Sequence, residues 1–209
     1  MNVLVVAPHP DDEAIGCGGA ICLHVGRGDR VAAVFLTSGE LGLKHLPREE
    51  AWRIREAEAD TAAEVLGLSH LTFLRGPDWF VGDHVDGLAS GLRGVLGREA
   101  PHRVYLPHAG EEHPDHRAAL PVVRAALRAS APPPPALVAY EVWTPLAEYH
   151  QVEDISPVIA RKLRAVRCYR SQIGYFRYDR AVCGLNQYRG ALAARSGYAE
   201  VFRHEAPSA

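Results

Sequence analysis

Short β-branched segments alternate along this chain with segments that have the length and pattern of helices. The segment from Asn2 to Ala7 is continuously apolar, as in a strand buried on both faces of a parallel sheet. Repeated strand and helix units of this size favour a doubly wound sheet. We therefore predict an α/β fold with a Rossmann-like, doubly wound and mostly parallel sheet and a small C-terminal elaboration. The expected strands are 2–7, 31–37, 71–74, 104–106 and 137–143, and the expected helices are 13–26, 47–66, 85–98, 116–130 and 156–170.

The last quarter of the chain is less regular than the rest. Ser156 and Pro157 form a typical helix start, with serine as the cap and proline at the first helical position. Tyrosine, arginine and glycine are frequent between residues 169 and 188, which suits a rim over a pocket. We expect a single domain over 1–209, in which about 150–209 pack on the sheet edge after a stiff proline connection at 132–135.

The composition is that of an ordinary globular protein and excludes several classes of partner. The 209 residues are 47% hydrophobic and 23% charged, with a formal net charge of -2 and a pI near 6.6. Lysine and arginine are scattered, so no basic face is offered to nucleic acid or to anionic lipid. No apolar run approaches membrane-spanning length, and no signal-peptide pattern precedes the first strand. We expect a cytoplasmic protein with reduced cysteines and without a nucleic-acid or membrane partner.

Two clusters of histidine and aspartate follow expected strands. His9-Pro10-Asp11-Asp12-Glu13 comes directly after the first strand, and His113-Pro114-Asp115-His116 follows the strand at 104–106. An imidazole and three carboxylates at the end of a buried strand need a partner, and a cation is the obvious one. Because ligands bind beyond the carboxyl ends of parallel strands, both clusters can converge there with the loops at 37–40 and 75–78.

A metal site is the simplest interpretation of the two clusters. His9, Asp12 and His116 supply two imidazoles and one carboxylate, and they leave a fourth position open for water, as in catalytic zinc sites. Adjacent side chains diverge from a turn, so Asp11 need not face the ion and is free to act as a base. Glu13, at the helix start, is expected to satisfy backbone donors and to complement the helix dipole.

The paired clusters resemble the zinc-dependent de-N-acetylases related to the N-acetylglucosaminyl-phosphatidylinositol deacetylase, the PIG-L or LmbE-like family. The bacterial relatives act in mycothiol and bacillithiol biosynthesis and in antibiotic tailoring. The resemblance covers most of the chain, because further segments are similar to the family: Thr37-Ser38-Gly39-Glu40, Arg53-x-x-Glu56, Leu66-Gly67, Asp78 and Ser171-Gln172.

The resemblance implies specific roles in the hydrolysis of an N-acetyl amide. His9, Asp12 and His116 would hold Zn2+, with Fe2+ or another divalent ion as an alternative, and Asp11 would be the general base. His113 would be the electrophile or acid, oriented by Asp115. The implied substrate is a small N-acetylated amino sugar or its conjugate, and the resemblance also allows a homo-oligomer.

The chemistry of amide hydrolysis supports the same division of roles. Bound zinc lowers the pKa of its water to ~7 and polarises the carbonyl, and a nearby carboxylate can take the water's proton. The oxyanion needs a further donor, which a protonated His113 held by Asp115 would supply. The leaving amine takes its proton from either Asp11 or His113, and both possibilities stay open.

Candidate substrate contacts come from several segments. Arg53 is the best candidate for gripping a hydroxyl or acidic group, and its alternative is an exposed ion pair with Glu49 or Glu56. Aromatic residues can stack on a sugar face or serve as buried structural residues. The candidates for substrate binding are Arg53, Glu40, Asp78 and Tyr140, with Trp143 and Tyr175 as further aromatics and with His108 and Glu111 close enough to His113 to line the pocket.

Three other functions are compatible with parts of the sequence. Gly16-Cys17-Gly18-Gly19 invites a dinucleotide-binding oxidoreductase, although the spacing is not G-x-G-x-x-G and acidic residues precede the glycines. A non-catalytic sugar- or metal-binding module would bind zinc without turnover, and the presence of Asp11 argues against it. An amidase that cleaves thiol conjugates would use the same zinc chemistry on a larger substrate.

Overall fold

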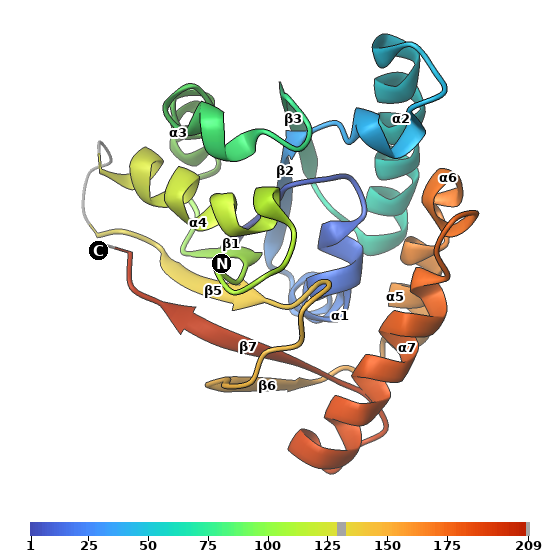
Figure 1. Ribbon diagram of the computed structural model, residues 1–209. Coiled ribbons are helices and arrows are strands. Elements are labelled where there is room, and N and C mark those ends of the chain that lie inside the picture. The colour runs from blue at the N-terminus through green and yellow to red at the C-terminus, as the bar shows by residue number, and fades with distance from the viewer. Residues whose placement is uncertain (129–132, 208–209) are drawn as a thin grey trace.

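The protein is built on one twisted sheet of seven strands, described by a computed structural model that covers residues 1–128 and 133–207. The strand order is β3-β2-β1-β4-β5-β7-β6, and the first five strands run parallel (Figure 1). The predicted Rossmann-like, mostly parallel sheet is therefore confirmed. The strands are β1 (Asn2–Ala7), β2 (Arg30–Thr37), β3 (His70–Gly76), β4 (Arg103–Pro107), β5 (Ala136–Tyr140), β6 (Gln151–Asp154) and β7 (Ala199–Glu205).

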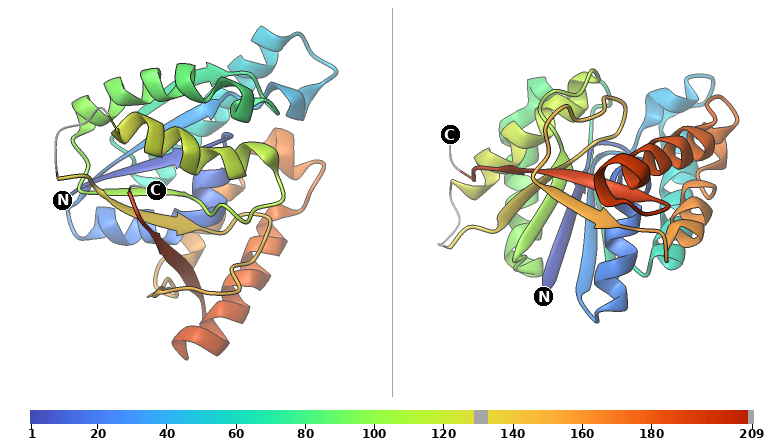
Figure 2. Two further views of the ribbon diagram at one scale, coloured as in Figure 1. Left: turned by 60° about the vertical axis from the view of Figure 1, so that its left-hand side comes forward. Right: turned by 90° about the horizontal axis from the view of Figure 1, so that it is seen from below.

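Helices cover both faces of the sheet and enclose two apolar cores (Figure 2). Val3 and Val5 of β1 point into the core beneath α1, α2 and α5, whereas Leu4 and Val6 point into the core beneath α3 and α4. This double burial is the reason for the continuous apolar run in the sequence. The helices are α1 (Asp12–Gly26), α2 (Arg48–Leu66), α3 (Val85–Glu99), α4 (Pro114–Leu127), α5 (Ile159–Val166), α6 (Arg170–Ile173) and α7 (Tyr178–Arg189), with short turns η1 (Glu40–Leu43), η2 (Val81–His84) and η3 (Gly190–Ala194).

Helix α1 approaches the sheet unusually closely and is kinked. A Cβ atom added at Gly16 would lie 2.2 Å from the ring of Tyr140, so only glycine fits at this contact. The backbone leaves helical geometry at Cys17, and the Glu200 carboxylate of β7 accepts hydrogen bonds from the N–H groups of Gly19 and Ala20 just beyond the kink. Glu200 thereby satisfies donors that the kink releases from the helix ladder.

The C-terminal segment adds β7 antiparallel to β5 and then β6 antiparallel to β7. The predicted start of α5 at Ser156 is wrong, because the helix begins at Ile159 and the Ser156 hydroxyl accepts a hydrogen bond from the N–H of Tyr198 instead. The helix also ends at Val166, before the predicted Arg170. The serine serves a tertiary contact and not a helix cap.

Two further predicted boundaries differ from the observed ones. Strand β5 ends at Tyr140, three residues before the predicted end, because the N–H groups of 142–144 donate to the Glu111 carboxylate and not to a neighbouring strand. Helix α4 ends at Leu127. The predicted end of that helix at Ser130 and the first residue of the proline connection, Pro132, lie outside the described residues. None of the described helices combines the length and apolar character needed to cross a membrane.

Candidate metal centre and active site

The two histidine clusters meet at the point where the strand order reverses. The chain leaves β1 toward β2 on one side, whereas β4 lies on the other side of β1. His9 follows β1, and His113 and His116 follow β4, so their loops diverge from adjacent strands. Crevices at such a switch point are the usual ligand sites of doubly wound sheets.

The predicted ligand residues lie around one carboxylate oxygen. Asp12 Oδ2 is 3.2 Å from His9 Nδ1 and 3.3 Å from His116 Nε2. In a tetrahedral zinc site with bonds of about 2.0–2.1 Å, neighbouring ligand atoms are roughly 3.3–3.4 Å apart. The donor types of His9, Asp12 and His116 and their two separations through Asp12 therefore match such a site. His113 is close as well, because nitrogen atoms of His9, His113 and His116 all lie within 4.8 Å of one another.

Further carboxylates surround the outer nitrogens of both imidazoles. His9 Nε2 lies 3.0 Å from Asp115 Oδ2 and 3.2 Å from Asp78 Oδ1. His116 Nδ1 lies 3.4 Å from Glu111 Oε2. Such outer carboxylates orient metal-binding histidines and raise their basicity.

The charges of this cluster favour a cation at its centre. Burial lowers the pKa of His116, but Asp12 and Glu111 outweigh it and raise that pKa to about 9. Burial likewise opposes the carboxylates around His9, which raise its pKa well above the ordinary value. The two imidazoles in turn hold the pKa of Asp12 far below its usual range, against the effect of burial. In the absence of a metal, protons on the imidazoles supply the positive charge.

Glu111 connects a ligand histidine to the far wall of the site. Its fully buried carboxylate accepts hydrogen bonds from the backbone N–H groups of Val142, Trp143 and Thr144. Glu111 thus lies behind His116, and the expectation that it lines the pocket near His113 is wrong. The loop after β5 is consequently fixed to the same carboxylate that faces His116.

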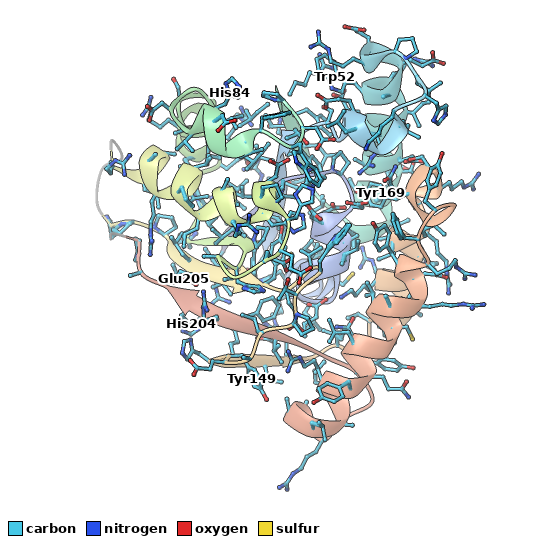
Figure 3. All side chains as sticks on the ribbon, viewed as in Figure 1. Trp52, His84, Tyr149, Tyr169, His204 and Glu205 are labelled. Carbon is cyan, nitrogen blue, oxygen red and sulfur yellow. The ribbon has the colours of Figure 1, made fainter. Side chains whose placement is uncertain are left out.

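Asp11 occupies a strained position in the turn between β1 and α1. Its φ of 129° is rarely adopted by residues other than glycine, which costs on the order of 1–3 kcal/mol. Hydrogen bonds hold the turn: Glu13 accepts from the N–H of Asp11, and Arg55 donates to the carbonyl oxygen of Pro10. Glu13 also accepts from the hydroxyl of Tyr169, which lies at the junction of α5 and α6 (Figure 3). The expectation that Glu13 satisfies a backbone donor is confirmed.

The Asp11 carboxyl lines the cavity beside Asp12. Burial raises its pKa to about 7, although the Arg55 guanidinium, 3.4 Å away, lowers it. Asp11 is thus a separate acid-base group next to the ligand carboxylate.

The arginine at the site is Arg55 and not Arg53. Arg53 is exposed, with Nη2 3.7 Å from Glu50 Oε1, whereas Arg55 is buried and lines the cavity. Two residues correspond to about 200° around a helix, so the two arginines point to opposite sides. The prediction of Arg53 as a substrate contact is contradicted by this position. The sequence could have indicated Arg55, because it falls at helical spacing between Ala51 and Ala59 on the buried face of α2.

The predicted contacts Tyr140 and Glu40 are structural in this fold. Tyr140 is fully buried and donates a hydrogen bond to the carbonyl oxygen of Val6, so it does not reach the cavity. Glu40 accepts from the indole N–H of Trp52 and from the N–H of Asp78. Asp78, in contrast, lines the cavity as predicted, and Glu40 holds its loop in place.

His113 and Asp115 interact in a different way from the one predicted. His113 is the N-cap of α4, and its Nδ1 accepts the backbone N–H of Asp115 at 3.2 Å. The Asp115 carboxylate accepts from the N–H groups of Trp79 and Val81 and faces His9. Asp115 therefore holds the His113 ring through its backbone N–H, whereas its carboxylate orients His9 and the loop after β3.

The N-cap bond also fixes the tautomer of His113. Because Nδ1 accepts a hydrogen bond, the single proton of the neutral ring is on Nε2. Burial and the neighbouring His9 and His116 lower the pKa of His113 to about 4. A neutral ring of this tautomer can donate a hydrogen bond through Nε2.

A cavity of about 850 Å³ opens over these groups. Loops after all five parallel strands contribute to it, together with α2 and the segment from α6 to α7. Polar walls come from Arg55, Asp78 and Gln172, and the exposed aromatic side chains of Trp79 and Trp143 form part of the rim. The size suits a sugar-sized molecule with substituents.

Comparison with known proteins decides the family. The PIG-L family model, described as GlcNAc-PI de-N-acetylase, matches residues 4–127. The chain belongs to this family.

Individual PIG-L relatives agree over most of the chain. A probable N-acetyl-alpha-D-glucosaminyl L-malate deacetylase 2 from Bacillus cereus is 34% identical over 82% of this chain and 83% of its own length. A diacetylchitobiose deacetylase from Thermococcus kodakarensis is 32% identical over 82% of this chain and 70% of its own. The crystal structure of a conserved protein from Thermus thermophilus superposes with a TM-score of 0.82 at 31% identity, covering 100% of this chain and 96% of that one.

The PIG-L assignment settles the class of reaction. The protein is a metal-dependent N-deacetylase and not a dinucleotide-binding oxidoreductase. The family resemblance expected from the two histidine clusters is confirmed.

Proposed function

We propose that this protein hydrolyses the N-acetyl amide of a small amino sugar or sugar conjugate, with zinc held by His9, Asp12 and His116. The proposal is carried by the placement of Asp12 Oδ2 between His9 Nδ1 and His116 Nε2, with Asp11 beside it. Two relatives named for N-acetylglucosaminyl malate and diacetylchitobiose support the substrate class. We further propose that residues 1–209 act as one domain.

Each residue of the site has a distinct task in the reaction. When bound, zinc lowers the pKa of water to about 7 and polarises the amide carbonyl. The Asp11 carboxylate accepts the proton of the attacking water, and Arg55 holds this carboxylate in place. His113 Nε2–H donates to the amide oxygen as negative charge develops there.

The tautomer of His113 supports Asp11 as the group that makes the second proton transfer. The neutral ring carries one proton, and giving it away would leave an imidazolate, which is unfavourable. Asp11 has by then gained a proton from the water and returns it to the leaving amine. Asp11 thus acts as base and then as acid, while His113 stays a hydrogen-bond donor.

The polar wall of the cavity suits the hydroxyl groups of a sugar. Asp78 offers carboxylate oxygens as acceptors, and Arg55 offers guanidinium donors.

The test is an assay for acetate and free amine over a panel of N-acetyl sugars, combined with metal analysis. We expect about one zinc per chain, loss of turnover with a chelator, and recovery with added zinc. A His9→Ala/His116→Ala double variant should lose both metal and turnover. Unchanged metal content in that variant, or turnover that resists the chelator, would contradict the proposal.

A further inference from the structure

A second cavity of about 340 Å³ lies next to the active-site cavity. Both cavities share Trp143, Phe176 and Tyr178 as walls. The remaining walls of the second cavity come from the start of α1, the loop after β5, helix α7 and strand β7. The proposed deacetylation chemistry makes no use of this space.

The second cavity offers apolar surface and no free polar partner among the described residues. Its charged wall residues are already paired: Glu141 accepts from Arg189, and Glu200 accepts from Lys162. A polar ligand would therefore find no compensating hydrogen bond and would lose its hydration. The apolar part of the wall is formed by Ile15, Val142, Pro145, Ala181, Leu185 and Val201. A cavity with apolar walls and no free polar partner among the described residues favours an aliphatic group as its ligand.

The sheet order places the second cavity on the side of the metal centre opposite the polar wall. Asp78 follows β3, and Arg55 lies on α2 between β2 and β3, so both stand on the β2–β3 side of β1. Trp143 follows β5, which lies beyond β4 on the other side. The amide to be cut is bound at the centre. If its hydroxyl-bearing amine part fills the polar side, its acyl part points toward Trp143 and the second cavity.

We propose that the second cavity is an acyl subsite and that the enzyme hydrolyses N-acyl amino sugars with aliphatic chains longer than acetyl. The inference rests on the proposed function and extends its substrate class. In the reaction the amide C–N bond breaks, the hydroxyl of water joins the acyl carbon, and its proton goes to the amine. The products are a fatty acid and a free amino sugar.

Three aromatic rings form the boundary through which the chain would pass. The ring centroids of Trp143 and Phe176 are 6.3 Å apart, and those of Phe176 and Tyr178 are 5.6 Å apart. Trp143 is 50% exposed and Phe176 is 58% exposed, so both can change rotamer with little loss of packing. A chain of several methylenes can thereby reach the apolar walls beyond.

The test compares N-acetyl-glucosamine with its N-butanoyl, N-hexanoyl and N-octanoyl analogues. Each methylene buried in the cavity should raise kcat/KM by about fourfold, so the hexanoyl compound should exceed the acetyl compound by at least about tenfold. Ala181→Trp, which fills the cavity from an exposed helix position, should remove this advantage and leave acetyl turnover unchanged. Ala191→Trp is the matched control, because Ala191 is exposed and does not line the cavity.

Two results would overturn the acyl subsite. One is a kcat/KM that falls as the chain grows beyond acetyl in the wild-type enzyme. The other is equal hexanoyl turnover in the wild type and in Ala181→Trp.

A binding measurement separates this inference from the proposed function. Hexanoate, measured by calorimetry, should bind the wild type at least about tenfold more tightly than acetate, and Ala181→Trp should abolish the difference. Hexanoate binding of this kind without turnover of any N-acyl sugar would contradict the proposed function and support the subsite. Acetyl turnover with equal binding of the two acids would support the proposed function and overturn the subsite.

Discussion

At the scale of single residues, two adjacent aspartates have different surroundings. Asp12 Oδ2 contacts both ligand imidazoles, and Asp12 also accepts the backbone N–H of His9. Asp11 has the strained φ of 129° and faces Arg55. The strained φ of Asp11 keeps its carboxylate apart from that of Asp12. With an ordinary φ at Asp11, the backbone of the turn would follow a different path.

Substitutions of the two aspartates should therefore have different effects on metal binding and turnover. Asp11→Asn should retain the metal and lose about 10²–10⁴-fold in kcat, as expected for removal of a general base. Asp12→Asn should lose both metal and turnover, because it removes a ligand oxygen. Metal content and single-turnover rates of the two isosteric variants check this. Loss of the metal in Asp11→Asn would show that the ligand and base roles are misassigned.

The sequence indicated the cluster of the proposed metal site better than the polar wall of the cavity. His9, Asp12 and His116 are recognisable because histidine and carboxylates at strand ends require a partner, and the structure brings them together. Arg55 was not predicted as a cavity residue, because a charged residue on the buried face of a helix departs from the usual pattern of apolar residues on that face. Glu111 was noticed for its position near His113, but its role behind His116 could not be foreseen, because its partners are backbone groups of a loop some thirty residues away.

At the scale of elements, the position of α1 depends on glycine at its contact with β5. A Cβ atom at Gly16 would lie 2.2 Å from the Tyr140 ring, and Tyr140 is itself fixed by its hydrogen bond to Val6. Because α1 begins at Asp12, a shift of this helix moves a proposed metal ligand. The packing of α1 on the sheet thus bears directly on the site.

Gly16→Ala should lower the free energy of unfolding by about 2 kcal/mol or more, because overpacking outweighs the gain in helix propensity. Gly26→Ala in the same helix is the matched control. Its added Cβ meets no atom of the described residues within 4 Å, so stability should stay unchanged or rise by up to about 1 kcal/mol. Urea unfolding of both variants measures the difference. Equal stabilities would contradict the tight contact between α1 and β5.

The elements of the first two thirds of the fold could be predicted from the sequence, whereas in the last third only helix α5 was predicted, with both of its ends misplaced. Strands β1 to β5 alternate with helices, and their apolar runs follow from burial on both faces. Strand β7 pairs with β5 across some sixty residues, and no local pattern encodes that pairing. Ser156 misled the prediction because a serine before proline serves a helix cap and a tertiary acceptor equally well.

At the scale of the whole molecule, one buried ion pair joins the C-terminal segment to the N-terminal helix. Lys162 of α5 donates to Glu200 of β7 and to Asn186 of α7, and Glu200 accepts from the backbone of α1. Lys162 and Glu200 are 0% and 2% exposed, so solvent does not screen the pair. Four elements from both ends of the chain therefore meet at this pair, close to the wall of the proposed acyl subsite.

Lys162→Met should destabilise the protein by about 3–5 kcal/mol, because it leaves the Glu200 carboxylate buried without its counter-ion. Lys162→Met/Glu200→Gln should be less destabilised than the single variant, since the double change removes both charges. Lys44→Met is the control, because Lys44 is the chain's other lysine and is exposed. Denaturant unfolding of the three variants gives the comparison. A Lys162→Met protein within about 1 kcal/mol of the Lys44→Met control would show that the ion pair does not hold the C-terminal strand against α1.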